Sequence, residues 1–488
     1  MPQYADETGI GGGPLADNSA EPSRAPRLAR DPARRVLMIV SDFPPSIEMG
    51  AQTCWQIARN LPRHGWTPIV LTKGERHVDS RDAAQAGFEP GVTVVRTGVL
   101  PHPVQLLRRL RAGRTGEGEA IAMEATLAPR RRRGWLRRVV LAGLNVPDTE
   151  TGWILPAVAA GRGLVRRSDV ACLFSSGPAW SSHLAALGLA RLTGLPWVAH
   201  FRDPWSQGAT YSGEHPWADR ANARLERDVV RRAATVICVT DRHTNLLRRY
   251  YPDCRPEKFV TVTNGYDSAE WEQAEQDAAA GPASARGGRF VITHAGALYA
   301  GRSPLPVLEA LRRLSQTSDL TLDRVRFDVI VNDNVRQLPD GRDIMDVASQ
   351  MGLGGSVQVL GPLPRREALR RLLDSDLLLL LGHNFTVQVP GKLYEYLRSR
   401  RPILALVPAG AQTDLLRATG GAWIVEPEDV EGAVQAVRDA YGRWQAGRGG
   451  PEADARLVSG FDRRVLVGRI AAELAAAVSR AAERRGRR

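Results

Sequence analysis

Short apolar runs alternate with helix-length segments along most of this chain, and the alternation occurs in two series. Several runs are apolar at nearly every position, as in strands that a parallel sheet buries on both faces. Strands separated by helix-length segments are the repeating unit of doubly wound α/β domains, so the sequence predicts two such domains. The predicted strands lie at 35–40, 68–71, 92–96, 169–175, 197–201, 235–239 and 260–262 in the first series, and at 290–293, 327–331, 356–360, 377–381, 402–407 and 422–425 in the second.

Composition marks the boundaries of these domains. The first residues are rich in Gly, Pro, Ala and Arg without a period, which predicts a disordered tail. The long Ala-rich helix predicted at 463–482 has no strand partner, so we expect it to pack back across the first domain. The predicted boundaries are 1–34 for the tail, 35–270 for the N-terminal domain with a basic insertion at about 101–167, 271–288 for a linker, 289–455 for the C-terminal domain and 456–488 for the crossover helix and basic tail.

The charge balance favours an anionic partner. The formal net charge is +13, and arginine supplies nearly all of the positive charge, because the lysines are Lys73, Lys258 and Lys392 alone. The insertion holds a run of four arginines at 130–133 and a mixture of Trp, Leu, Val and Arg at 135–144. That pattern favours a surface that contacts anionic lipid, and the alternative is a solvated loop and helix in an arginine-rich protein. Nucleic-acid binding is disfavoured because no recognition motif accompanies the charge.

The four cysteines indicate a reducing compartment. They show no Cys-x-x-Cys spacing and have no metal-ligand neighbours, so we expect neither a disulfide framework nor a metal site. The N-terminus lacks a signal-peptide pattern, and no apolar run approaches the length of about 20 residues that spans a bilayer. We therefore expect a cytoplasmic protein, either soluble or peripheral on the inner face of the membrane.

The stretch VQVPGKLYEYLRSRRPILAL at 387–406 carries the clearest signs of a ligand site. Pro390 suits a helix start, and Gly391 admits a ligand close to the backbone. A helix N-terminus attracts phosphate, and Lys392 adds a full positive charge there. Glu395, one turn further on, is an acceptor for sugar hydroxyls. The alternative is an ordinary amphipathic helix with a surface Lys–Glu pair.

Two other loops that follow predicted strands carry glycines. Gly50 precedes a predicted helix and admits a ligand at the helix start, although a plain turn glycine has the same sequence pattern. Gly296 ends the first strand of the second series, and Gly301 and Arg302 precede the helix that follows.

The motifs together resemble the family 4 glycosyltransferases of the GT-B fold, in particular the bacterial branch that builds cell-surface polysaccharides. The resemblance covers roughly residues 35–440. It rests on HFRDPW at 200–205, THAGALYAGRSPLPVLEAL at 293–311 and VPGKLYEYLRSRRPILAL at 389–406. It implies two Rossmann-like domains that face a cleft, with the donor bound by the C-terminal domain.

The resemblance also assigns roles to individual residues. Gly296 matches the family's loop glycine, and Arg302 falls on the lysine that holds the donor diphosphate. Lys392 shares that role and Glu395 matches the carboxylate that binds the ribose. Gly391 belongs to the same loop, and Gly50 would lie over the diphosphate. Two positions depart from the family pattern, because Ala297 replaces an arginine and Val387 replaces a second glutamate.

The implied activity is retaining transfer of a hexosyl group from a nucleotide-diphosphate sugar, without a cofactor or an essential metal. The leaving diphosphate can accept the acceptor's proton in such a reaction. His200, Arg202 and Asp203 are the catalytic candidates, while a buried neutral histidine and a loop-stabilising aspartate are the alternative roles for the first and last. The expected acceptor is a glycan or a lipid-linked molecule.

Three other functions fit parts of the sequence. A sugar-nucleotide 2-epimerase shares the fold but needs several carboxylates around the sugar, which Val387 argues against. A non-catalytic protein that binds nucleotide sugars, or scaffolds an assembly complex, would tolerate both Ala297 and Val387. Nucleic-acid binding rests on charge alone.

Overall fold

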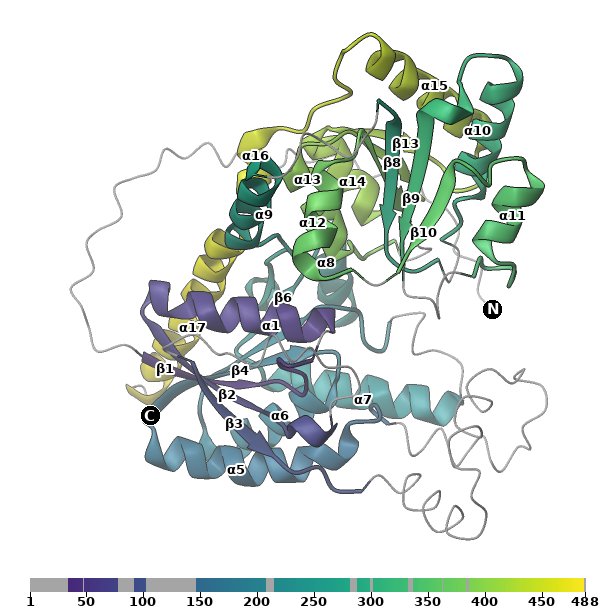
Figure 1. The fold of residues 1–488 in the computed structure, drawn as a ribbon. Coiled ribbons are helices and arrows are strands. Elements are labelled where there is room, and N and C mark those ends of the chain that lie inside the picture. Colours follow the sequence, from purple (N-terminus) through teal and green to yellow (C-terminus); the bar gives the residue numbers. More distant parts are fainter. Residues whose placement is uncertain are drawn as a thin grey trace.

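Two α/β domains stacked on each other make up the described part of the protein, which we analysed as a computed structural model (Figure 1). Helices cover both faces of each sheet, as the alternating sequence pattern predicts. The structure describes residues 34–46, 48–77, 92–101, 146–207, 215–280, 288–298, 302–331, 337–361, 363–382 and 386–486.

The N-terminal domain is built on a seven-stranded parallel sheet with the order β3-β2-β1-β4-β5-β6-β7. The order reverses between β1 and β4, so the carboxyl ends of the central strands face a crevice where ligands bind in such sheets. The strands are β1 (Arg34–Ile39), β2 (Trp66–Lys73), β3 (Thr93–Thr97), β4 (Val170–Gly177), β5 (Trp197–Phe201), β6 (Thr235–Cys238) and β7 (Phe259–Thr261).

Helices bury apolar faces against both sides of this sheet. One core contains Ala157, Leu189 and Val229, contributed by three successive helices on the same side. The helices of the domain are α1 (Met49–Asn60), α5 (Ile154–Arg167), α6 (Ser181–Thr193), α7 (Pro216–Arg232) and α8 (Asp241–Tyr250), with short 3-10 turns at Leu61–His64, Glu75–His77, Thr151–Trp153 and Pro256–Lys258.

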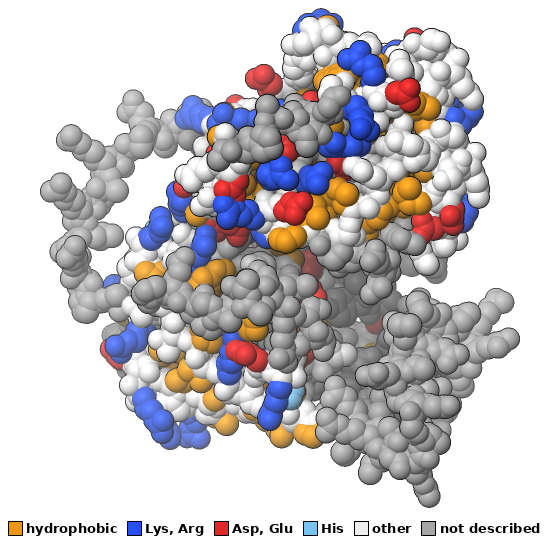
Figure 2. Space-filling model, in the orientation of Figure 1, with side chains coloured by type: hydrophobic (Ala, Val, Ile, Leu, Met, Phe, Trp, Pro, Cys, Tyr) orange, Lys and Arg blue, Asp and Glu red, His pale blue; other side chains and the backbone are white. Residues whose placement is uncertain are grey.

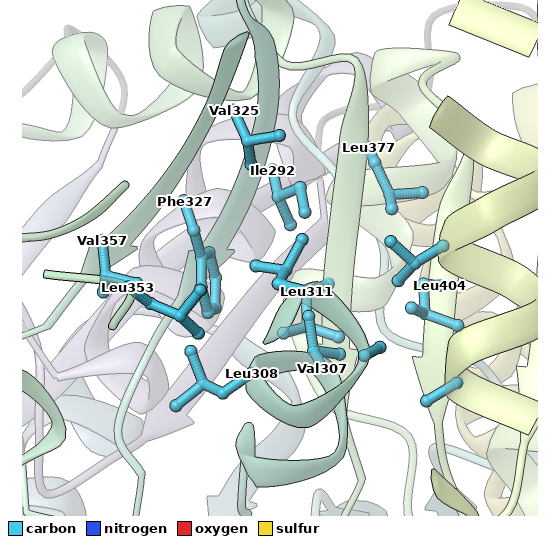
Figure 3. Close-up of a cluster of buried hydrophobic side chains, with 14 of the residues drawn as sticks. Ile292, Val307, Leu308, Leu311, Val325, Phe327, Leu353, Val357, Leu377 and Leu404 are labelled. Atoms are coloured by element: carbon cyan, nitrogen blue, oxygen red, sulfur yellow. The ribbon is translucent and has the colours of Figure 1, made fainter. Parts of the chain in front are cut away.

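The C-terminal domain repeats the architecture with a six-stranded parallel sheet of order β10-β9-β8-β11-β12-β13. Figure 3 shows its core, where Val307, Leu308 and Leu311 of one helix pack on Ile292 and Phe327 of the sheet. The elements are β8 (Phe290–Ala295), α10 (Leu305–Gln316), a 3-10 turn (Leu322–Arg324), β9 (Val325–Ile330), α11 (Ile344–Gln350), β10 (Val357–Leu360), α12 (Arg365–Leu373), β11 (Leu377–Leu381), α13 (Gly391–Ser399), β12 (Ile403–Leu406), α14 (Ala411–Thr419), β13 (Ala422–Val425) and α15 (Val430–Gln445).

The predicted linker is wrong for most of its length, because residues 268–280 form helix α9 (Ser268–Ala280). Trp271 and Ala274 lie three residues apart on one face and are fully buried in a core of the C-terminal domain. The guanidinium of Arg398 lies 5.5 Å from the Trp271 ring centroid, and it also pairs with Glu275 at 2.7 Å. A composition rich in Glu and Ala suits a helix as well as a linker, and the buried tryptophan decides between them.

The crossover helix is confirmed as α17 (Arg463–Gly486), which follows the short α16 (Ala455–Ser459). Its apolar stripe, including Leu466, Ile470 and Leu474, packs with α1 in the second core of the N-terminal domain. Arg463 at its start is buried and donates to the Gln56 side chain at 3.1 Å and to the Gly265 carbonyl at 3.2 Å. The helix therefore ties the end of the chain to the first domain.

Two details differ from the sequence predictions. Gly50 lies inside the first turn of α1, because the helix begins at Met49. Residues 154–167 of the predicted basic insertion form α5, which contributes Ala157 and Gly161 to the domain interior. The basic stretches at 130–133 and 135–144, the predicted disorder of 1–33 and Gly301 lie outside the described residues. None of the described helices is long and apolar enough to cross a bilayer.

We predict that Trp271→Ala destabilises the C-terminal domain by about 3–5 kcal/mol, the usual cost of truncating a buried tryptophan. Urea unfolding of the full chain, followed by far-UV circular dichroism, measures the change. The matched control is Arg366→Ala, which removes an exposed ion pair to Asp277 between α12 and α9 and should cost less than about 1 kcal/mol. Equal effects of the two substitutions would show that α9 is not a packed part of the domain.

Candidate functional site

The loop at 386–390 and the start of α13 lie against the N-terminal domain. Pro390 takes the N-cap position with φ of −67°, and Gly391 is the first helical residue. A side chain at Gly391 would come within 3.7 Å of the Met49 sulfur at the start of α1. The N-termini of α13 and α1 therefore meet, and both direct backbone N–H groups toward the space between the domains.

Lys392 reaches from α13 to the end of β8. Its Nζ donates to the Ala295 carbonyl at 3.0 Å, and a Cβ at Gly296 would lie 3.1 Å from the same nitrogen. Gly296 has φ of +123°, a conformation that L side chains rarely adopt. Burial lowers the pKa of Lys392 to about 7, Arg302 acts in the same direction, and Glu395 opposes both. The structure thus brings Lys392 together with Gly296, Arg302 and Glu395, which are four of the six residues that the sequence predicted for the donor site.

Buried polar groups hold the Ala295–Gly296 turn in place. The ring nitrogens of His294 lie 2.9 Å from the Leu379 carbonyl and 3.0 Å from the Gly296 carbonyl. Burial lowers the pKa of His294 well below its ordinary value, and the positive charge of Lys392 lowers it further. The hydroxyl of Tyr396 accepts a hydrogen bond from the Ala295 N–H at 2.9 Å. A histidine inside an otherwise apolar strand was the available sequence signal for this arrangement.

Glu395 is buried and forms an ion pair with Arg365 of α12. Burial alone would lower the pKa of Arg365, but Glu395 and Glu270 outweigh it and raise the pKa overall. The Arg365 Nε also lies 3.1 Å from Glu270 Oε2 on α9. A carboxylate accepts up to about four hydrogen bonds, so this pairing leaves Glu395 able to accept from sugar hydroxyls. Sequence reasoning missed Arg365, which no motif near Glu395 signals.

His200 lies inside the N-terminal domain. It is 3% exposed on β5, its Nδ1 is 3.1 Å from Ser176 Oγ, and its ring packs against Phe174. Burial lowers the pKa of His200 well below its ordinary value, and Arg202 lowers it further. The imidazole is therefore neutral near pH 7, which agrees with the alternative role that its sequence position allowed.

Arg202 occupies the space that Gly50 leaves open. A Cβ on Gly50 would lie 2.2 Å from Arg202 Nη1, so a side chain there would push the guanidinium away. The guanidinium donates to the Pro178 carbonyl, and the Arg202 N–H donates to the Gly177 carbonyl at 2.9 Å. Gly50 was predicted to admit a ligand, and in this structure it admits the arginine of the HFRDPW motif.

Asp203 faces the other domain. Gln388 of the C-terminal loop donates to Asp203 Oδ1 at 2.5 Å. Burial raises the pKa of Asp203, while Arg202 and Gln388 oppose that shift. The same loop is also bonded to Thr240, whose hydroxyl donates to the Val387 carbonyl at 2.5 Å. The departure from the family pattern at Val387 thus lies at the domain contact.

The loop is therefore held by residues that follow three adjacent N-terminal strands. Asp203 follows β5 and Thr240 follows β6, while Asn264 follows β7 and lies 3.5 Å from the Val389 carbonyl. At the rim, Arg242 pairs with Asp414 at 2.5 Å. Sequence reasoning missed Thr240, Gln388 and Asn264, because contacts between domains leave no local pattern.

A charged cluster also lies at the carboxyl ends of β1 and β2. Lys73 is 4% exposed, and its Nζ lies 2.9 Å from Asp42 and 2.8 Å from Glu150. Burial alone would lower the pKa of Lys73, but the two carboxylates raise it overall. Both carboxylates keep part of their surface exposed at this edge of the sheet. Among the residues with described positions, no group of three or more His, Cys, Asp or Glu side chains could hold a metal ion.

Comparisons with known proteins concern the N-terminal domain in sequence and nearly the whole chain in structure. Residues 50–265 match the family described as "Glycosyl transferase 4-like domain". Trehalose-6-phosphate synthase from Burkholderia multivorans matches in structure with a TM-score of 0.61 and 16% identity, covering 93% of this chain and 98% of the other. No curated protein matches the chain in sequence.

Two further solved structures share the architecture. Sucrose-phosphate synthase from Thermosynechococcus elongatus has a TM-score of 0.51 at 13% identity, covering 93% of this chain and 98% of its own. Anabaena HepE, in complex with UDP and glucose, has a TM-score of 0.51 at 13% identity, covering 93% of this chain and 99% of its own. At these identities the likeness concerns the fold.

Proposed function

We propose that the protein is a retaining glycosyltransferase that uses a nucleotide-diphosphate sugar, because residues 50–265 match the family described as "Glycosyl transferase 4-like domain" and the chain has the GT-B fold. The transferred group is a hexosyl unit, and the acceptor is a glycan or a lipid-linked molecule. The reaction belongs to the assembly of cell-surface polysaccharide on the cytoplasmic side of the membrane.

One observation carries the proposal, namely the position of Lys392. Its ammonium lies at the N-terminus of α13, beside Gly296 and close enough to Arg302 for the two charges to interact. Two cations and unpaired helix N–H groups would neutralise a diphosphate without a metal ion. Burial strengthens these interactions, since the local dielectric is lower than that of water.

The residues of the N-terminal domain support a reaction without a dedicated general base. Burial lowers the pKa of His200 well below its ordinary value, so its imidazole is a weak base, and Asp203 already accepts a hydrogen bond from Gln388. In the proposed reaction the bond between the anomeric carbon and the diphosphate oxygen breaks, and the acceptor oxygen bonds to that carbon. The acceptor's proton passes to the leaving diphosphate. Arg202 and Asp203 then position the acceptor and the donor loop.

The direct test is a donor panel. HepE is described with UDP and glucose, so UDP-sugars are the first probes, followed by GDP- and TDP-sugars. The proposal expects calorimetric binding of at least one donor and its slow hydrolysis in the presence of EDTA. Binding of no donor would refute the proposal, and binding without any hydrolysis or transfer would favour a non-catalytic protein.

The pKa of Lys392 predicts that donor binding is coupled to proton uptake. In the free protein this pKa is about 7, and a bound diphosphate raises it. Donor affinity should therefore be constant below the free pKa and fall by up to about tenfold per pH unit between the free and the bound pKa. Calorimetry in two buffers of different ionisation enthalpy, at about pH 8, measures the uptake. Lys392→Arg should abolish it, and persistent uptake in that variant would exclude Lys392 as the source.

We predict that Glu395→Ala weakens donor binding by about 1.5–3 kcal/mol, the cost of losing a charge-assisted hydrogen bond. Glu395→Gln removes the charge that pairs with Arg365 but keeps an oxygen that can accept a hydrogen bond from ribose. It therefore distinguishes loss of the ribose hydrogen bond from loss of the ion pair. The control is Glu367→Ala on α12, where an exposed carboxylate lies 3.6 Å from Arg371. Wild-type donor affinity in Glu395→Ala would rule out the ribose role.

A further inference from the structure

A basic cavity lies at the amino-terminal edge of the N-terminal sheet, the edge opposite the interdomain contact. It has a volume of about 940 Å³ and lies between the ends of α7 and α17, beneath the segments that lead into β5, β6 and β7. Seven of its lining residues are Arg or Lys and two are Asp or Glu. Figure 2 shows Lys and Arg side chains on both domains of the viewed face, and Figure 1 places the C-terminus at the lower left of the N-terminal domain.

Internal contacts account for some of these cations. Arg231 pairs with Asp253 at 2.7 Å, Arg480 donates to the Thr235 hydroxyl at 2.7 Å, and Lys258 donates to the Arg231 carbonyl at 2.9 Å. Arg480 and Lys258 donate to neutral oxygens. These hydrogen bonds therefore leave the positive charges of both side chains uncompensated. The second carboxylate of the lining belongs to Glu257.

Four other arginines of the cavity form no ion pair within the described residues, and one of them, Arg232, donates to the Ala190 carbonyl. Arg484 and Arg485 lie in the last turn of α17, and Arg255 lies on the loop before β7. Burial lowers the pKa of Lys258, and the charges of Arg484 and Arg255 add to that effect. The fold therefore gathers like charges around one concavity instead of dispersing them.

Helix dipoles do not compensate this charge. The C-terminus of a helix carries about half a negative charge, and α6, α7 and α17 end at the cavity. Together they offset roughly one to two of the five excess positive charges that line it. The remaining charge calls for an external anion, and phosphate groups match arginine forks in charge and geometry.

Exposed apolar side chains flank the cavity and indicate the kind of partner. Leu192 is 59% exposed and lies two residues before the lining residue Gly194. Tyr250 is 54% exposed and lies three residues before Asp253. Basic residues beside Leu and Tyr suit a bilayer surface, where the cations meet headgroups and the apolar groups enter the interface. A nucleic-acid surface would gain nothing from the exposed leucine.

We propose that this edge docks on an anionic membrane surface and that the cavity receives a lipid phosphate headgroup. The proposal specifies the membrane partner of the proposed glycosyltransferase, but docking itself does not require catalysis. With this edge on the bilayer, the cleft at the carboxyl ends of the strands stays in the aqueous phase, where nucleotide sugars are dissolved.

Vesicle flotation of the full chain tests the proposal. We expect binding to phosphatidylcholine vesicles that contain phosphatidylglycerol, no binding to phosphatidylcholine alone, and loss of binding at high salt. Arg484→Glu/Arg485→Glu should lower the partition coefficient by at least about fivefold per arginine removed. Arg255→Glu, at the start of the 3-10 turn before β7, should lower the partition coefficient by a similar factor per arginine. The matched control is Arg417→Glu/Arg448→Glu, which changes the charge equally on exposed positions of the C-terminal domain and should bind like the wild type.

Two results would overturn the proposal. Equal loss of binding in the cavity variants and in the C-terminal control would mean that net charge, and not this surface, directs the protein to lipid. Tighter binding to a DNA duplex than to the vesicles at the same salt would assign the surface to nucleic acid. Donor calorimetry on the same variants keeps the two proposals separate, because vesicle binding can fail while donor binding persists.

Discussion

The contact between the C-terminal loop 387–391 and the N-terminal domain is the interaction on which the rest of the site depends. Thr240 and Asn264 approach its backbone carbonyls, and Gln388 reaches across to Asp203. These partners follow three adjacent parallel strands, whose carboxyl ends meet at one edge of the sheet. One short loop therefore aligns the start of α13 with the N-terminal domain.

Desolvation sets the chemistry of that site. Burial brings the pKa of Lys392 to about 7, so a modest change in local charge decides whether the side chain is protonated. A diphosphate would supply such a change, since it brings negative charge to a cation that donates to the neutral Ala295 carbonyl and forms no ion pair within the described residues. Glu395 lies one turn away and forms an ion pair with Arg365, which orients the carboxylate.

The two edges of the N-terminal sheet differ in their electrostatics. The edge toward the cleft combines buried charges with opposite partners, as in the cluster of Lys73 with Asp42 and Glu150. The opposite edge collects arginines at the ends of α7 and α17 with few carboxylates. Basic residues favour helix C-termini, and a doubly wound domain places those ends at the amino-terminal edge of its sheet. The topology thus turns a local preference into one basic surface.

The sequence by itself determined the two α/β domains, most strand positions and the residues around Lys392. Apolar runs, glycines at strand ends and a Pro-Gly-Lys helix start are local patterns that the backbone obeys directly. The crossover helix followed from its length and its lack of a strand partner. Local pattern also misled at 271–288, because the composition there suits a linker, whereas the burial of Trp271 makes most of it a packed helix.

Only the tertiary structure decided which of these residues meet. The pairing of Glu395 with Arg365, the fit of Arg202 against Gly50 and the hydrogen bond of Asp203 with Gln388 join segments between 30 and 185 residues apart. Such contacts depend on how helices and domains pack, and no short motif records that packing. The same reason explains the basic cavity, whose arginines come from distant helix ends that converge only after the C-terminal helix crosses back to the first domain.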